Sequence, residues 1–203
     1  WAPEARLRRL IRIDNPEAAM GDGVRPVIWL APHFIGLDMG GVRLSMERRA
    51  ASIYARVRNP VSDRMVLRGR SRFFSPLLVS KHEGIKPVLR ALRDGLPFYY
   101  LPDQDQGIHN AVFAPFFGVP AASITSPSRL ARLSGAAVVP FFQVRLPHGQ
   151  GYQLTLYPAL QNFPGDDIMQ DTLRVNQILN KRIAVVSFRF KFTPKGCLWI
   201  LNK

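Results

Sequence analysis

His33 and Asp38 are the two residues of this sequence whose types and spacing best suit the transfer of a proton. They begin and end the segment HFIGLD, residues 33–38. If a helix begins within this segment, Asp38 can fold back and hold one nitrogen of the His33 ring, so that the other nitrogen accepts a proton. Such a base could deprotonate a substrate hydroxyl, which would then attack an acyl thioester. A plainer interpretation of a histidine beside a proline is a structural one.

Three more polar residues could contact a substrate. Arg70 could hold a phosphate through its planar guanidinium, although the arginines around it are equally consistent with a solvated basic stretch. Asp103 and Asp105 could orient polar substrate groups. Because Pro-Asp segments readily form turns, these two carboxylates are also consistent with a turn that has no contact with substrate.

Short apolar runs precede most of these residues and predict the strands that position them. The expected strands are Val27–Ala31, Ala51–Tyr54 and Leu96–Leu101. His33 follows the first of them, Arg56–Asn59 follows the second, and Asp103–Gly107 follows the third. In an open α/β sheet, ligands bind beyond the carboxyl ends of the strands. We therefore expect the three polar segments to meet along one edge of a sheet.

Helical and extended patterns alternate along the rest of the chain. Further helices are expected over Gly36–Arg49, Gly84–Asp94, Ser126–Leu133 and Asp171–Ile183, and further strands over Ala136–Val144 and Tyr152–Tyr157. This alternation predicts an α/β fold with a largely parallel or mixed central sheet and flanking helices. Ala111–Thr125 is rich in Pro and Phe, and we expect it to be a loop that covers the site.

The composition is strongly basic. There are 28 Lys and Arg against 14 Asp and Glu, which gives a formal net charge of +14. Such a surface attracts polyanions, among them nucleic acid, anionic lipid headgroups and acidic carrier proteins. Nucleic-acid binding is disfavoured because most aromatic residues lie in apolar runs or Pro-rich segments, not interleaved with exposed basic residues.

The 203 residues suit a single domain spanning 1–203. The single cysteine, Cys197, excludes a disulfide within the chain, and the histidines lack zinc-ligand spacing, so no metal site is expected. No apolar run approaches the roughly 18 residues that span a bilayer. Residues 1–19 are basic and partly periodic, which fits either an ordinary surface helix or an interfacial helix on anionic lipid.

Taken in order along the chain, these motifs resemble those of the late acyltransferases of bacterial lipid A biosynthesis, the lauroyl/myristoyl acyltransferase family. His33–Asp38 matches the family's HX4D/E motif, Gly69–Arg72 resembles its arginine-bearing block, and Tyr100–Gly107 resembles its PD-x-D-x-G signature. The HX4D spacing alone is common by chance, but the three blocks in this order are specific. The resemblance extends from Val27 to Ile183.

The resemblance implies an acyltransferase with a glycerolipid-acyltransferase-like fold. A fatty acyl group would pass from acyl carrier protein to a hydroxyl of a phosphorylated, Kdo-bearing lipid A precursor, at the cytoplasmic face of the bacterial inner membrane. His33 would be the general base and Asp38 its orienting partner. The residues implied to contact substrate are Arg70, Asp103, Gln104 and Asp105. No cofactor is implied beyond the carrier-protein thioester, and both an acidic carrier and an anionic lipid suit the charge of +14.

The ends of the chain depart from the family pattern. The family normally begins with a hydrophobic membrane helix, which this sequence does not show, and residues 184–203 form an atypical C-terminal segment. Two alternatives remain open. One is a glycerolipid (lysophospholipid-type) acyltransferase, although such enzymes carry a Pro-Glu-Gly-Thr type segment where this chain has Pro102–Asp105. The other is a basic membrane- or nucleic-acid-binding module without catalysis.

Overall fold

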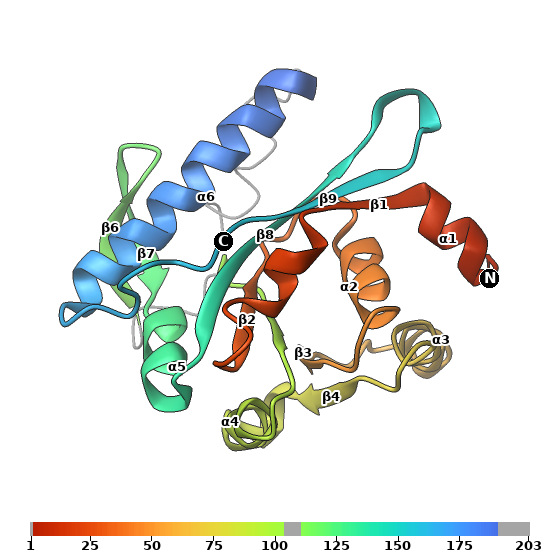
Figure 1. The fold of residues 1–203 in the computed structure, drawn as a ribbon, viewed down its shortest axis with the longest axis horizontal. Coiled ribbons are helices and arrows are strands. Elements are labelled where there is room, and N and C mark those ends of the chain that lie inside the picture. Colours follow the sequence, from red (N-terminus) through yellow and green to blue (C-terminus); the bar gives the residue numbers. More distant parts are fainter. Residues whose placement is uncertain (1, 104–110, 191–203) are drawn as a thin grey trace.

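A seven-stranded mixed sheet forms the centre of the protein (Figure 1). The structure, a computed structural model, describes residues 2–103 and 111–190. The strands are β1 (Ile11–Asp14), β2 (Val27–Leu30), β3 (Ala51–Tyr54), β4 (Leu77–Ser80), β5 (Phe98–Tyr100), β8 (Ala137–Arg145) and β9 (Tyr152–Leu156). Their order is β1-β9-β8-β2-β5-β3-β4; β8 through β4 run parallel, and β9 is antiparallel to β8. The predicted α/β class with a largely parallel or mixed sheet is confirmed.

The strand β2 lies between β8 and β5 and is covered on both faces. All four of its residues are buried. Ile28 and Leu30 enter the core on one face of the sheet, whereas Val27 and Trp29 enter the core on the other face. Because alternate side chains of a strand point to opposite faces, a strand buried on both faces is apolar throughout. This burial explains the continuous apolar run that predicts the strand.

Helices cover both faces of the sheet. One core receives side chains of α4 (Lys86–Arg93), α5 (Ser126–Ser134) and α6 (Ile168–Phe190), and the other receives those of α2 (Leu37–Ser45). The predicted helices correspond to these four, with different ends. A further helix, α3 (Pro60–Arg70), packs against α2 and is absent from the prediction, as is β4. Only Asp63 of α3 is buried, so this helix shows no apolar periodicity.

The N-terminal segment is a short helix followed by a strand. Its helix, α1 (Glu4–Leu10), ends where β1 begins, and β1 pairs in parallel with β9. Leu7 and Leu10 pack against the core on the α2 face, and Ile11 is buried within it. The apolar side of this segment is therefore used inside the protein, which favours the ordinary surface helix over the interfacial one. A 3-10 helix, η1 (Pro16–Met20), leads on towards β2.

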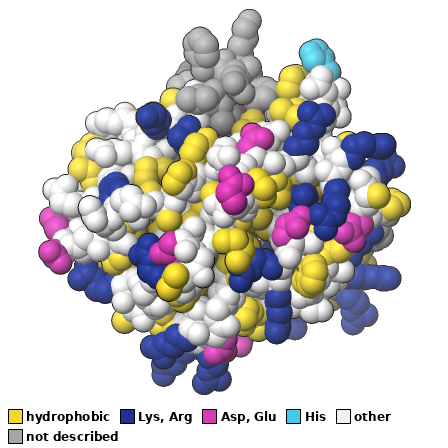
Figure 2. Space-filling view, in the orientation of Figure 1, with side chains coloured by type: hydrophobic (Ala, Val, Ile, Leu, Met, Phe, Trp, Pro, Cys, Tyr) yellow, Lys and Arg dark blue, Asp and Glu magenta, His cyan; other side chains and the backbone are white. Residues whose placement is uncertain are grey.

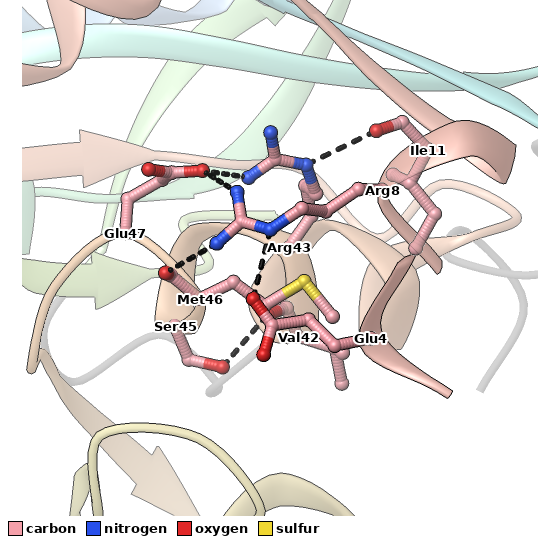
Figure 3. Close-up of polar contacts among 8 residues, drawn as sticks. All are labelled: Glu4, Arg8, Ile11, Val42, Arg43, Ser45, Met46 and Glu47. Atoms are coloured by element: carbon pink, nitrogen blue, oxygen red, sulfur yellow. Dashed lines mark hydrogen bonds and ion pairs between the residues drawn. The ribbon is translucent and has the colours of Figure 1, made fainter. Parts of the chain in front are cut away.

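Glu47 links α1 to the end of α2 through two arginines (Figure 3). Its Oε1 accepts hydrogen bonds from Arg43 and from Nη1 of Arg8, the latter at 2.6 Å. Arg8 also donates to Glu4 at 2.8 Å, and Arg43 donates to the Ile11 carbonyl at 3.1 Å. Burial alone would raise the pKa of Glu47, but the hydrogen bonds from Arg43 and Arg8 outweigh it and lower this pKa. The network fixes α1 and β1 against α2.

The expected loop over Ala111–Thr125 is a β-hairpin instead. Its strands, β6 (Ala111–Phe116) and β7 (Val119–Ile124), pair antiparallel as a separate two-stranded sheet beside α6 (Figure 1). The residues between them, Phe117 and Gly118, both have positive φ angles, 50° and 80°, as primed hairpin turns require. The loop prediction is wrong because Phe117 and Gly118 form a two-residue turn, which lets the Pro- and Phe-rich residues on either side pair as strands.

Short 3-10 helices, η2 (Lys81–Glu83) and η4 (Pro147–Gly149), complete the connections. Within residues 2–103 and 111–190, no helix combines the length and the apolar character that a bilayer crossing requires.

Candidate active site

Asp103 holds His33 by both its ring and its backbone. His33 Nδ1 and Asp103 Oδ1 are 2.7 Å apart, and the His33 backbone N–H donates to Asp103 Oδ2, also at 2.7 Å. The Asp103 side chain is 9% exposed, whereas that of His33 is 30% exposed. A buried carboxylate therefore orients an imidazole that a substrate can still approach.

The pairing of β2 with β5 brings these two residues together. The strands are adjacent and parallel, with Leu30 opposite Tyr100, and the Ala31 N–H donates to the Tyr100 carbonyl at 2.8 Å. The segments that follow the two strands leave the sheet at the same edge, so His33 and Asp103 meet beyond the strand ends. Residues 56–59 follow β3 and leave the sheet at the same edge, as predicted, because β3 lies next to β5 and runs parallel to it.

Asp103, and not Asp38, is the carboxylate at Nδ1 of His33. Gly36, with φ of 103°, turns the chain between the histidine and α2, so the helix starts at Leu37. The first turn of α2 presents Asp38 to α3, where Arg70 donates to Asp38 Oδ1 from Nε at 3.0 Å and from Nη2 at 2.8 Å. A catalytic role for Asp38 and a phosphate-binding role for Arg70 remain predictions.

Gln143 holds the carbonyl of the residue before His33. Its Nε2 donates to the Pro32 carbonyl at 2.9 Å, and its side chain is fully buried in β8. The Phe34 N–H donates to the same carbonyl at 2.8 Å. The Pro32–His33 peptide is thus fixed at its C=O by Gln143 and at its N–H by Asp103. Gln143 is absent from the residues predicted from the sequence. The available signal was an amide within the apolar run of β8, because a buried polar group requires a hydrogen-bond partner.

An apolar pocket of about 80 Å³ lies between α2 and the sheet, beside the Asp38–Arg70 pair. Trp29 and Tyr99 of the sheet and Val42 of α2 contribute to its walls. Burial, and to a smaller extent the negative charge of Asp38, raises the pKa of Tyr99. The neutral phenol donates to the Leu37 carbonyl at 3.2 Å and so fixes the start of α2 over the pocket.

Two of the predicted substrate-binding residues, Gln104 and Asp105, lie outside the residues that the structure describes. Among residues it does describe, no three His, Cys, Asp or Glu side chains are grouped so as to hold a metal ion.

The geometry suits general-base catalysis. A carboxylate bonded at Nδ1 favours the tautomer in which Nε2 is the proton acceptor, and it stabilises the imidazolium that proton transfer produces. A hydroxyl brought to Nε2 would be activated for attack on an acyl carbonyl. The site therefore has the groups needed for acyl transfer to an alcohol without a protein nucleophile.

Comparison with known proteins gives a consistent result. Residues 3–188 match the family described as bacterial lipid A biosynthesis acyltransferase. The lipid A biosynthesis lauroyltransferase of Escherichia coli (strain K12) is 33% identical over 180 residues, which cover 85% of this chain and 58% of the relative. The lipid A biosynthesis palmitoleoyltransferase of the same strain is 29% identical over 202 residues, covering 98% and 62%. The chain thus spans less than two thirds of the length of these relatives.

A solved structure shares the fold. The 1-acyl-sn-glycerophosphate (LPA) acyltransferase PlsC from Thermotoga maritima is similar with a TM-score of 0.52, over 88% of this chain and 72% of that one. Sequence identity is 14%, so this likeness concerns the fold alone. The expected glycerolipid-acyltransferase-like fold is confirmed.

Proposed function

The chain belongs to the bacterial lipid A biosynthesis acyltransferases, and we propose from this membership that it transfers a fatty acyl group to a hydroxyl of a lipid A precursor, with His33 as general base. The observation that carries the mechanism is the double hydrogen bond of Asp103 to the ring and backbone of His33. A base that is held at both points needs little reorganisation when a hydroxyl arrives.

The proposed reaction is a single displacement at the acyl carbonyl. Nε2 of His33 takes the proton of the acceptor hydroxyl while the hydroxyl oxygen attacks the thioester carbon. The tetrahedral intermediate collapses, the C–S bond breaks, and the imidazolium returns its proton to the departing thiolate. Asp103 stabilises the positive charge on the ring throughout. The products are an ester on the lipid and the free thiol of the carrier, and no cofactor is consumed.

The proposed donor is acyl carrier protein, and the proposed acceptor is a phosphorylated, Kdo-bearing glucosamine disaccharide. The net charge of +14 supports both, because each partner is anionic. We assign a phosphate of the acceptor to Arg70, which is partly exposed beside Asp38. We place the reaction at the cytoplasmic face of the bacterial inner membrane, where acyl carrier protein and a lipid acceptor can meet.

The test is an assay with acyl carrier protein thioesters and the Kdo-bearing lipid A precursor. We expect an acylated product, and we expect His33→Ala to lower kcat by at least about 100-fold, the lower end for loss of a general base. His82→Ala, which alters an exposed histidine of η2, is the matched control and should retain activity.

The same assay separates the alternatives. Product from a lysophospholipid acceptor but not from the lipid A precursor would point to a glycerolipid acyltransferase. Absence of turnover with every acceptor would favour a basic binding module. Activity that survives His33→Ala would refute the mechanism but not the family assignment.

A further inference from the structure

The outward face of α3 carries apolar and cationic side chains in alternation. Val61, Arg64, Met65 and Arg68 follow one another at helical spacing and lie on one side of the helix. Val61 is 68% exposed and Met65 is 56% exposed. Large apolar side chains left in water along one face of a helix mark a surface that another component covers.

The flanks of α3 continue this pattern. Val57 and Phe74, before and after the helix, are also exposed; Arg58 follows Val57 directly, and Arg72 lies two residues before Phe74. We name these eight residues the α3 surface: Val57, Arg58, Val61, Arg64, Met65, Arg68, Arg72 and Phe74. Figure 2 shows Lys and Arg side chains, with hydrophobic ones between them, in the region where α3 lies in Figure 1.

Among the described residues, no carboxylate is ion-paired with the arginines of the α3 surface. The acidic residue of α3, Asp63, is on the inward side, where it accepts hydrogen bonds from the Tyr54 hydroxyl and, at 2.8 Å, from the Val57 N–H. The bond from Tyr54 is the main cause that lowers the pKa of Asp63. Within residues 2–103 and 111–190, Arg58, Arg64 and Arg68 form no ion pair with a carboxylate. The charged side chains of the α3 surface are therefore all cationic.

The interleaving of arginine and apolar side chains suits an anionic lipid surface. On α3, Arg64 and Arg68 flank Met65 on the same face, so each apolar side chain lies beside a cation. At an anionic bilayer both types are satisfied together, because apolar side chains enter the boundary between headgroups and acyl chains while arginines bind lipid phosphates.

We propose that the α3 surface docks the protein on an anionic lipid bilayer. The inward side of the same helix bears Arg70, which is bonded to Asp38 beside the candidate active site. Docking through the outward face would therefore place the bilayer about one helix diameter, roughly 10 Å, from the Asp38–Arg70 pair. The proposal rests on the proposed function for its purpose, since the acceptor would be a lipid, but its evidence is independent of catalysis.

The test is binding of the 203-residue chain to vesicles, without acyl donor. Vesicles of phosphatidylglycerol and phosphatidylcholine in equal parts are compared with vesicles of phosphatidylcholine alone, by co-sedimentation. We expect binding to the anionic vesicles, and we expect the double change Arg64→Gln/Arg68→Gln to weaken it roughly 30-fold, the effect of two arginines near a charged membrane. Val61→Ser/Met65→Ser should weaken it roughly tenfold through lost apolar burial.

Matched controls come from the opposite face of the sheet. Arg90→Gln/Arg93→Gln makes the same change of charge on α4, and Leu133→Ser removes an apolar side chain of α5 that is 60% exposed. Both should bind the vesicles as the wild type does. Circular dichroism checks that each variant folds, which is expected because all the altered side chains are exposed.

Several outcomes would overturn the proposal. One is equal loss of vesicle binding in the α3 and α4 arginine pairs, which would mean that net charge alone drives adsorption. Another is that the α3 variants lose binding to acyl carrier protein but still bind vesicles, which would make α3 the surface that binds the carrier protein. Failure of the wild type to bind anionic vesicles would also overturn the proposal. If the chain docks through α3 but transfers no acyl group, the docking proposal stands and only the proposed function is contradicted.

Discussion

At the scale of single residues, the site depends on how tightly one peptide and one ring are held. Asp103 takes both the N–H and the Nδ1 of His33, and Gln143 takes the carbonyl of the preceding residue. Each of these hydrogen bonds links the segment after β2 to a neighbouring strand or to the segment that follows one. The position of the proposed base is thus set by the sheet, not by the loop that carries it.

Asp103→Asn removes the negative charge at Nδ1 while keeping the size of the side chain. We expect kcat to fall by roughly 100-fold or more with little change in KM, because the loss concerns the charge that develops on the ring in the transition state. Steady-state kinetics with a carrier-protein thioester would measure it. If Asp103→Asn keeps most of kcat while Asp38→Asn loses it, the orienting role belongs to Asp38 after all.

Gln143→Leu removes the hydrogen bond to the Pro32 carbonyl. We expect kcat to fall about tenfold as the peptide before His33 loosens. The free energy of unfolding should change by no more than about 1 kcal/mol, because the carbonyl keeps its bond from the Phe34 N–H and the unpaired Oε1 of Gln143 is removed at the same time. Gln153→Leu, in β9, is the control; a comparable fall in kcat there would show that the effect is not local.

At the scale of elements, the turn between β2 and α2 decides which charged side chains His33 and Asp38 meet. Gly36 has a left-handed backbone, and a Cβ at this position would lie 2.7 Å from Cδ1 of the Tyr152 ring in β9. The turn therefore needs glycine both for its φ angle and for the close approach of β9. It directs Asp38 towards α3 and leaves His33 facing the end of β5.

Gly36→Ala should lower the free energy of unfolding by about 2 kcal/mol or more, through left-handed strain and the contact with Tyr152. For a chain of this size that corresponds to a fall in Tm of roughly 4 to 8 °C, measured by thermal unfolding. Gly84→Ala is the matched control: φ is 71° there, but nothing lies within 4 Å of the added Cβ. Gly84→Ala should lower the free energy of unfolding by less than Gly36→Ala. Equal decreases in the two variants would show that the Tyr152 ring moves away from the added Cβ without cost.

At the scale of the whole molecule, the excess of 14 positive charges acts over a longer range than any single contact. The described carboxylates nearest the site are engaged: Asp38 by Arg70, Asp103 by His33, and Asp63 by Tyr54. Some exposed arginines, among them Arg64 and Arg68 of α3, form no ion pair with a carboxylate of the described residues. A partner that carries many negative charges is attracted before it makes specific contacts.

A higher salt concentration should therefore weaken the binding of the acyl carrier protein donor. Raising ionic strength from roughly 0.01 M to 1 M shortens the Debye length from about 30 Å to about 3 Å. We expect KM for the acyl carrier protein thioester to rise on the order of tenfold or more over this range. KM for an acyl-N-acetylcysteamine thioester, which is uncharged, should change little. A parallel rise for both donors would contradict electrostatic recruitment of the carrier.

The sequence by itself determined five of the seven strands of the central sheet, the class of fold and the edge at which the site lies. Apolar runs such as Val27–Ala31 are local consequences of burial, and the alternation of strands with helices implies a sheet whose parallel strands end together. The motif order from His33 to Asp103 likewise identified the family. These features are readable because periodicity depends only on neighbours along the chain.

Only the tertiary structure decided which groups meet at that edge. The bond between His33 and Asp103 depends on β5 lying beside β2, and the bond from Gln143 depends on β8 lying on the other side. Nothing in the spacing of His33 and Asp38 indicated that Asp103 holds Nδ1; the pairing of β2 with β5 brings that carboxylate to the ring. Hydrogen bonds require atoms within about 3 Å, and a sequence that sets each strand's burial does not set the order in which strands are placed side by side.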